Sequence, residues 1–211
     1  MPFTGSLVFV LCCAWALAPI GIAQNVPPAP NPDDSGPTIE YTMKYIRDRL
    51  DSVDIAWTSV AHTQSGDRHY ATKYNVSQAE ADPKRCTLGF RGTYYIDDRD
   101  SAAAVTISDT STKFSMHDVE RVLVEPRSAV DKRTNAMFDY SPDVYSVTMK
   151  MASGKTANLH LRIQGNGVSE RDLTNVEVHV DLLDEELANR LAKALIHGVE
   201  LCGGGDKDPF K

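Results

Sequence analysis

Two histidines, His62 and His69, have the clearest geometric argument for chemistry in this sequence. They flank Ser65-Gly66, which predicts a two-residue hairpin turn. That turn places His62 directly across from His69, on the face of the hairpin away from Trp57. Two imidazoles at this spacing can bind a metal ion, but zinc takes three or four protein ligands and the sequence indicates no third. We therefore expect two exposed histidines and no metal site. His62 and His69 are the candidate ligands if the protein does bind a metal.

Two other motifs resemble parts of ligand-binding loops but lack residues that such loops need. Gly154-Lys155-Thr156 resembles the end of a phosphate-binding loop, but Met149 stands where the first glycine belongs, and a strand is expected where a helix is required. Asp97, Asp98 and Asp100 carry oxygen ligands of the kind that calcium prefers, yet no glycine and no distal glutamate follow at loop spacing. We expect a hairpin turn at the first motif, a solvated turn at the second, and no cofactor.

The other histidines and the serines supply no catalytic group. His160 and His179 occupy polar positions of late strands, which predicts exposed side chains. His197 lies on the flank of the last helix, where we expect it to contact a strand carbonyl as a structural partner. No serine lies in a nucleophile elbow, and no His-Glu-x-x-His motif occurs. No catalytic residue is therefore predicted.

Residues 1–23 have the composition of a signal peptide. They contain no Asp, Glu, Lys or Arg, are apolar from Leu7 to Ala18, and end on Gly21-Ile22-Ala23, with small residues where signal peptidase reads the chain. We expect cleavage before Gln24, a secreted or periplasmic location, and no transmembrane segment in the mature chain. Lipid attachment at Cys12 or Cys13 is the alternative, but neither cysteine follows the small residues that such a site needs.

Composition divides the rest of the chain into three parts. Residues 24–37 are rich in proline and predict an extended linker. Residues 38–205 predict a single α+β domain of ordinary size, and residues 206–211 predict a flexible tail.

Removal of the leader leaves two cysteines, Cys86 and Cys202, in the mature protein. Two cysteines in an oxidising compartment predict one disulfide. Cys86 lies on the apolar side of a strand expected over 85–96, and Cys202 lies on the apolar stripe of the last helix, so both thiols point to the same interior. Two buried free thiols are the alternative.

The last helix, expected over residues 184–202, is the element that should cover the sheet. Its apolar residues recur at three- and four-residue steps and share one face. Asp184 is placed to cap the first turn, and Gly203 supplies a left-handed stop. A second helix is predicted over residues 39–52, with Thr38 as its cap.

Alternating apolar and polar residues predict seven or eight antiparallel strands. They are expected over residues 55–61, 70–76, 85–96, 105–107, 114–116, 145–151, 159–163 and 176–182. Trp57 is expected across from Tyr74, and residues 152–156 should form a hairpin turn. Residues 119–124 fit a strand or a short helix, and the polar stretch 127–142 predicts a long loop.

These elements predict an α+β fold. It has an N-terminal helix, a strongly bent antiparallel sheet or small barrel of seven to eight strands, and a closing C-terminal helix. Residues 188–197, which read ANRLAKALIH, and Leu201-Cys202-Gly203-Gly204 resemble the ending of a group of uncharacterised secreted bacterial proteins, as does a first helix opened by Pro37-Thr38. The order of strands and closing helix is similar to the pleckstrin-homology-like barrel. Neither resemblance implies an activity or a site.

Net charge is −7, and the sequence has no sustained basic run. Nucleic acid and anionic membranes are therefore not expected as partners, which leaves an unknown protein or small-molecule ligand. The first hypothesis is a secreted or periplasmic non-enzymatic binding or scaffolding module that uses the open end of the sheet or the loop 127–142. The alternatives are a metal-dependent or hydrolytic enzyme with dispersed site residues, and a structural envelope component.

Overall fold

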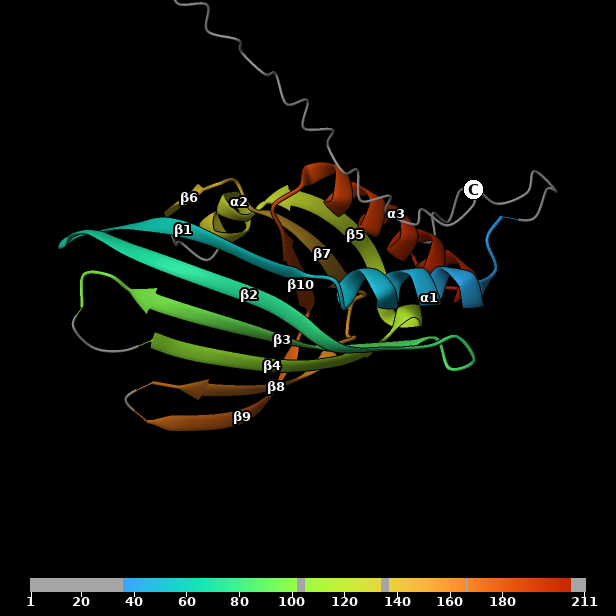
Figure 1. The fold of residues 1–211 in the computed structure, drawn as a ribbon. Coiled ribbons are helices and arrows are strands. Elements are labelled where there is room, and N and C mark those ends of the chain that lie inside the picture. Colours follow the sequence, from blue (N-terminus) through green and yellow to red (C-terminus); the bar gives the residue numbers. More distant parts are fainter. Residues whose placement is uncertain (1–35, 102–104, 134–136, 166, 206–211) are drawn as a thin grey trace, which may run out of the picture. The chain divides into compact units, whose positions relative to one another are not determined.

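The computed structural model describes residues 36–101, 105–133, 137–165 and 167–205 (Figure 1). The chain divides into two units, and all of the described residues belong to the second, Ser35–Lys211. The predicted signal peptide 1–23, most of the linker 24–37 and the tail 206–211 lie outside the described residues and stay predictions. Within the described ranges, no helix is both long enough and apolar enough to span a membrane.

The alternating segments form two antiparallel sheets. The larger sheet has the strand order β6-β1-β2-β3-β4-β8-β9, and the smaller has the order β10-β7-β5. The larger sheet contains β1 (Asp54–Thr63), β2 (Gly66–Asp82), β3 (Thr87–Asp98), β4 (Val105–Ser115), β6 (Phe138–Ser141), β8 (Ala157–Gln164) and β9 (Val168–Asn175). The smaller sheet contains β5 (Val119–Pro126), β7 (Tyr145–Met151) and β10 (Glu177–Leu182).

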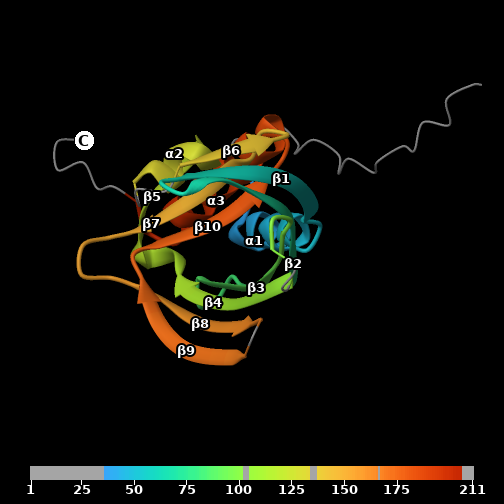
Figure 2. The same cartoon turned by 90° about the vertical axis from the view of Figure 1, so that its left-hand side faces the viewer.

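The larger sheet curves around the smaller one. Figure 2 shows this curve running from β6 and β1 at one end to β8 and β9 at the other. The two edge strands β6 and β9 do not pair in the described part of the chain. The predicted α+β class is therefore confirmed, and the small barrel is not.

Two long helices begin and end close to their predicted bounds. α1 (Ile39–Leu50) ends two residues earlier than expected, and α3 (Glu185–Leu201) follows Asp184 as its N-cap. The backbone N–H of Leu187 donates to the Asp184 carboxylate at 2.9 Å, and Gly203 follows the helix with a φ of 75°. Both ends of α3 therefore form as the sequence predicts, because a side-chain acceptor and a left-handed glycine satisfy its terminal groups.

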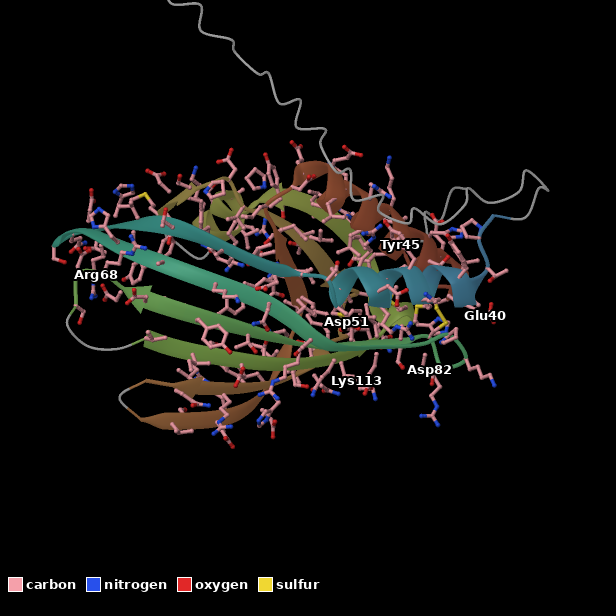
Figure 3. The ribbon with its side chains drawn as sticks, in the orientation of Figure 1. Glu40, Tyr45, Asp51, Arg68, Asp82 and Lys113 are labelled. Carbon is pink, nitrogen blue, oxygen red and sulfur yellow. A yellow bond between two sulfur atoms is a disulfide. The ribbon has the colours of Figure 1, made fainter. Side chains whose placement is uncertain are left out.

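The helices pack together and close one end of the core. α3 packs against α1 and against β5 and β7. A side-chain carbon at Gly198 would lie 3.1 Å from Met116 Cε and 3.3 Å from Ile46 Cδ1, so glycine permits this close packing. Asp51, labelled in Figure 3, follows α1 and accepts a 2.8 Å hydrogen bond from the backbone of Ala79, which ties the helix to the irregular part of β2.

Cys86 and Cys202 form a disulfide, which fits the predicted pairing. Their sulfur atoms lie 2.10 Å apart and their Cα atoms 5.8 Å apart. Cys86 lies just before β3 and not within it, since its φ is 51° and the strand begins at Thr87. Cys202 is the C-cap of α3. The bond therefore joins the end of the last helix to the start of the central strand.

The predicted register of the first hairpin is wrong by two residues. Gln64-Ser65 forms the turn, and Gly66, with a φ of 120°, begins β2. Trp57 consequently pairs with Thr72 and not with Tyr74. A shift of two residues keeps every side chain on its face, so Trp57 and Tyr74 remain on the core side as expected.

Other strand predictions are corrected by the sheet topology. Residues 145–151 and 159–163 do not form a hairpin, because β7 belongs to the smaller sheet and β8 to the larger. Residues 105–107 and 114–115 are parts of one strand, β4, and Met116 begins the 3-10 helix η1 (Met116–Asp118) that follows it. The long loop predicted over 127–142 contains the short helix α2 (Arg127–Lys132) and the edge strand β6. β9 was not expected, because its polar residues are exposed and do not alternate.

Candidate functional site

The smaller sheet turns a polar face toward the larger one. Ser146 pairs with Asp181 across β7 and β10, and Thr148 pairs with His179. The exposed fractions of Ser146, Thr148 and Asp181 are 0%, 1% and 0%. Because strand side chains alternate, the other face of both strands is apolar and packs into the core beside α3. Polar side chains buried in this way need partners. Ser146 and Thr148 find theirs on β10, and Asp181 also has partners on the larger sheet and on α2.

Asp181 is the centre of the buried polar network. Its Oδ2 accepts a hydrogen bond of 3.0 Å from the Tyr94 hydroxyl and one of 2.8 Å from Nη1 of Arg127. Its Oδ1 accepts from the Ser146 hydroxyl. Donors from β3, α2 and β7 thus converge on one carboxylate from β10, and they compensate its burial.

Arg127, the first residue of α2, bridges two carboxylates. Its Nε donates to Asp131 at 3.2 Å, and its Nη1 donates to Asp181. Tyr140 of β6 donates its hydroxyl to the other oxygen of Asp131. A guanidinium has five N–H groups, and the remaining ones of Arg127 meet no hydrogen-bond partner among the described residues. The segment that was expected to be a long loop therefore supplies Arg127 and Asp131. Together with Asp181 of β10 they form a group of buried charges that we call the charged wall.

A pocket of about 250 Å³ lies beside this wall, and we call it the aromatic pocket. Its aromatic walls are Trp57, Tyr70, Tyr94, Phe138 and Tyr140, and the rest of its lining is Ser59, Thr72, Ile96, Arg127 and Asp131. The Trp57 ring lies 6.5 Å from those of both Tyr94 and Tyr140. The pocket thus combines a ring-lined interior from β1, β2, β3 and β6 with two charged side chains from α2.

A second cavity, of about 180 Å³, shares Tyr94 and Arg127 with the aromatic pocket as lining residues. His179 lines this cavity, with Nδ1 3.0 Å from the Thr148 hydroxyl. Burial, and then the nearby Arg127, lowers the pKa of His179 below 6.5. The expected exposure of His179 is wrong, because the larger sheet covers its face of β10.

Tyr94, Tyr140 and Arg127 all have pKa values above their ordinary ones and stay protonated at neutral pH. Burial raises the pKa of Tyr94 well above its ordinary value, and the charge of Asp181 raises it further. Burial and the hydrogen bond to Asp131 raise the pKa of Tyr140. Burial alone lowers the pKa of Arg127, but the Asp181 and Asp131 carboxylates outweigh it and hold that pKa above its ordinary value. Fixed donors of this kind suit binding more than proton transfer.

The structure does not bring His62 and His69 opposite one another, so the predicted geometry is wrong. His62 Nδ1 lies 2.8 Å from Asp67 and Nε2 lies 2.9 Å from Asp139, while His69 Nδ1 lies 3.0 Å from Asp100. Both histidines are exposed, as expected. Among the residues that the structure describes, no three His, Cys, Asp or Glu side chains are grouped to hold a metal.

The other sequence motifs have structural partners. Asp98 bonds to Arg68, which Figure 3 labels near the tip of the first hairpin. Gly154 has a φ of 76° in the turn that leads from one sheet to the other. His197 Nε2 lies 3.0 Å from the Pro37 carbonyl, so its partner is a backbone carbonyl before α1 and not one in a strand.

Sequence reasoning missed Arg127, Asp131 and Asp181. The first two were assigned to a loop, and Asp181 occupies a polar position in an alternating strand. One signal was present: Ser146 and Thr148 at the polar positions of β7 are small hydroxyl residues, which can be buried with a single partner. Long charged residues are more typical of a solvent-facing strand.

No protein-family model, curated protein or solved structure matches the chain. The assignment of a function therefore rests on the geometry of the aromatic pocket and its charged wall.

Proposed function

We propose that the chain is a secreted or periplasmic binding module, without enzymatic activity, that holds a small molecule in the aromatic pocket. The observation that carries this proposal is the pocket itself, in which five aromatic side chains surround about 250 Å³ beside Arg127. Small-molecule sites are concave and mostly apolar or aromatic, with a few polar groups that fix the orientation of the ligand. The aromatic pocket has this composition.

The buried charges beside the pocket support a role in binding. A buried ion pair costs desolvation energy, and apolar residues of similar volume often stabilise a fold equally well. Arg127 is held by Asp131 and Asp181, so its position is set before a ligand arrives. A preorganised donor reduces the entropy cost of binding, because the side chain is already ordered before the ligand arrives.

Export is supported by two features of the chain. One is the predicted signal peptide, and the other is the disulfide between Cys86 and Cys202, since disulfides persist in oxidising compartments. The resemblance to secreted bacterial proteins stays a prediction and assigns no ligand.

The binding of a neutral aromatic dye, N-phenyl-1-naphthylamine, to protein that begins at Gln24 tests this proposal. Trp57 lines the pocket and is the only tryptophan after the leader, because the other is Trp15. Energy transfer from Trp57 therefore reports dye bound beside this residue, which lines the aromatic pocket and also a hollow on the outer face of the sheet. We expect saturable binding at one site.

Two substitutions on β1 form a matched pair for the same measurement. Ser59→Leu fills the aromatic pocket, whereas Ala56→Leu adds the same bulk to a more open hollow on the outer face of the sheet. We expect Ser59→Leu to weaken dye binding about tenfold or more and Ala56→Leu to leave it close to native. Thermal unfolding checks that both variants fold. Loss of binding only in Ala56→Leu would place the dye on the outer face and contradict the proposal.

A further inference from the structure

We propose that the ligand of the aromatic pocket is an uncharged, flat ring compound that carries a hydrogen-bond acceptor such as an amide, ketone or hydroxyl oxygen. This inference rests on the proposed binding function and assigns the chemical class of its ligand. Three features lead to it: the ring geometry of the walls, the two hydrogen-bonded carboxyl groups that flank Arg127, and the unused N–H groups of that arginine.

The walls of the pocket favour a flat, unsaturated ligand. Trp57 stands edge-on to Tyr94, with an interplanar angle of 84°, and is tilted by 60° from Tyr140. Phe138 lies 6.1 Å from Tyr140 at an angle of 33°. Rings inclined to one another in this way do not all turn the same surface to the space that they line. A planar ring system can stack on one wall while it makes an edge contact with another.

The charged wall disfavours an ionic ligand. Arg127 lies between the carboxyl groups of Asp131 and Asp181, so an anion at the guanidinium would approach two carboxyl groups as well. A cation would meet the guanidinium of Arg127. It would also find both oxygens of each carboxyl group already hydrogen-bonded within the wall. The wall has two carboxyl groups for one guanidinium, so an anion meets excess negative charge, and a cation finds no carboxyl oxygen without a hydrogen bond.

The unused N–H groups of Arg127 call for an acceptor on the ligand. Two hydrogen bonds go to Asp131 and Asp181, and in the described residues the other N–H groups have no partner. The side chain lines the pocket and is 25% exposed. A desolvated donor without a partner costs free energy, so a ligand that enters the pocket without an acceptor binds more weakly.

Calorimetric titration with three probes of one shape tests the proposed class. 2-Naphthamide, 2-naphthoate and 2-naphthamidine share one ring system and are neutral, anionic and cationic at neutral pH. We expect 2-naphthamide to bind at least about tenfold more tightly than either ion. The protein for this test begins at Gln24 and retains its disulfide.

Two conservative arginine variants test the role of the donor. Arg127→Lys keeps the charge but has fewer donors in a different geometry, and Arg133→Lys makes the same change at an arginine that bonds Glu125 outside the pocket. We expect Arg127→Lys to weaken 2-naphthamide several-fold and to affect hydrocarbon naphthalene, which has no acceptor, much less. Arg133→Lys should match the native protein. Thermal unfolding checks that both variants fold.

The outcomes separate this inference from the function on which it rests. Tighter or equal binding of 2-naphthoate or 2-naphthamidine would overturn the ligand class and leave a binding pocket in place. Equal affinity of the Arg127→Lys and Arg133→Lys variants for 2-naphthamide would overturn the role of the donor. Absence of binding by all three probes, together with absence of dye binding, would overturn both proposals.

Discussion

Asp181 of β10 and Arg127 of α2 are joined across the interior by a hydrogen bond of 2.8 Å between Oδ2 and Nη1. The same carboxylate accepts from Tyr94 of β3 and Ser146 of β7. One side chain with an exposed fraction of 0% therefore connects both sheets and α2. Removal of one partner from a buried ion pair leaves the other charge uncompensated.

We expect Asp181→Ala to lower the free energy of unfolding by about 3–5 kcal/mol, because Arg127 loses its nearest carboxylate and two hydroxyl donors lose their acceptor. Urea unfolding measures this change. Asp172→Ala is the control: the Asp172 side chain is 91% exposed on β9, and the variant should remain within about 0.5 kcal/mol of native. An Asp181→Ala protein as stable as the control would show that the network does not hold the sheets together.

Local signals were enough to predict the two long helices, several strands and the cysteine pair. α3 has a capping aspartate, an apolar stripe and a glycine stop within one continuous segment, so no distant residue is needed to recognise it. The segments of β3 and β10 alternate cleanly, and their bounds differ from the prediction by two residues or fewer. Cys86 and Cys202 were paired because few cysteines remain after the leader.

The candidate site depends on long-range arrangement, which one sequence does not contain. Alternation in β10 shows that Asp181 shares a face with His179, but it does not show that a second sheet covers that face. α2 has only six residues and no apolar stripe of its own, so Arg127 and Asp131 resembled loop residues. Burial of a polar residue is decided by the elements packed over it, which for Asp181 are β3 and α2, and α2 was expected to be part of a loop.

We expect His62 to make the attachment of β6 depend on pH. Its hydrogen bonds to Asp139 of β6 and to Asp67 of β2 raise the pKa of His62 above 6.5. Because the folded-state pKa is raised, this stabilisation is fully present below the unfolded-state value and is lost as pH rises through the folded-state value. β6 pairs only with β1 in the described sheet, so its four residues should respond first.

Proton NMR of the His62 imidazole and hydrogen exchange of the β6 amides test this expectation. We expect a titration midpoint above 6.5, and faster intrinsic-rate-corrected exchange of β6 on the alkaline side of that midpoint. Asp139→Asn removes the larger of the two hydrogen-bond contributions to the raised pKa of His62 and should lower the titration midpoint. If Asp139→Asn leaves the midpoint unchanged, Asp139 does not raise the pKa of His62 and the expected pH dependence of β6 is contradicted.

The start of the mature chain is predicted at Gln24, among residues outside the described part. N-terminal sequencing of exported protein should return Gln24 as the first residue, unless its side chain has cyclised, in which case intact mass identifies the same cleavage. Ala23→Arg places a long charged residue at a position that signal peptidase reads and should block processing, whereas Ile22→Arg lies between the two such positions and should be tolerated. A mature chain that begins at a lipid-modified Cys12 or Cys13 would contradict this prediction.

The disulfide should contribute to stability without contributing to the aromatic pocket. Cys86 and Cys202 are separated by 116 residues, and in the chain-entropy model a loop of this length corresponds to about 4–5 kcal/mol. Reduction removes the bond between the end of α3 and the start of β3. The lining of the pocket comes from β1, β2, β3, β6 and α2, and α3 provides none of it.

We therefore expect reduction to lower the free energy of unfolding by a few kcal/mol and to leave dye binding unchanged at temperatures where the reduced protein is folded. Urea unfolding with and without a phosphine reductant measures the first quantity, and energy transfer from Trp57 measures the second. The double variant Cys86→Ser with Cys202→Ser should unfold like the reduced protein and should not respond to the reductant. A reduced protein with native stability would show that packing of α3 against α1, β5 and β7 suffices to hold the helix in place.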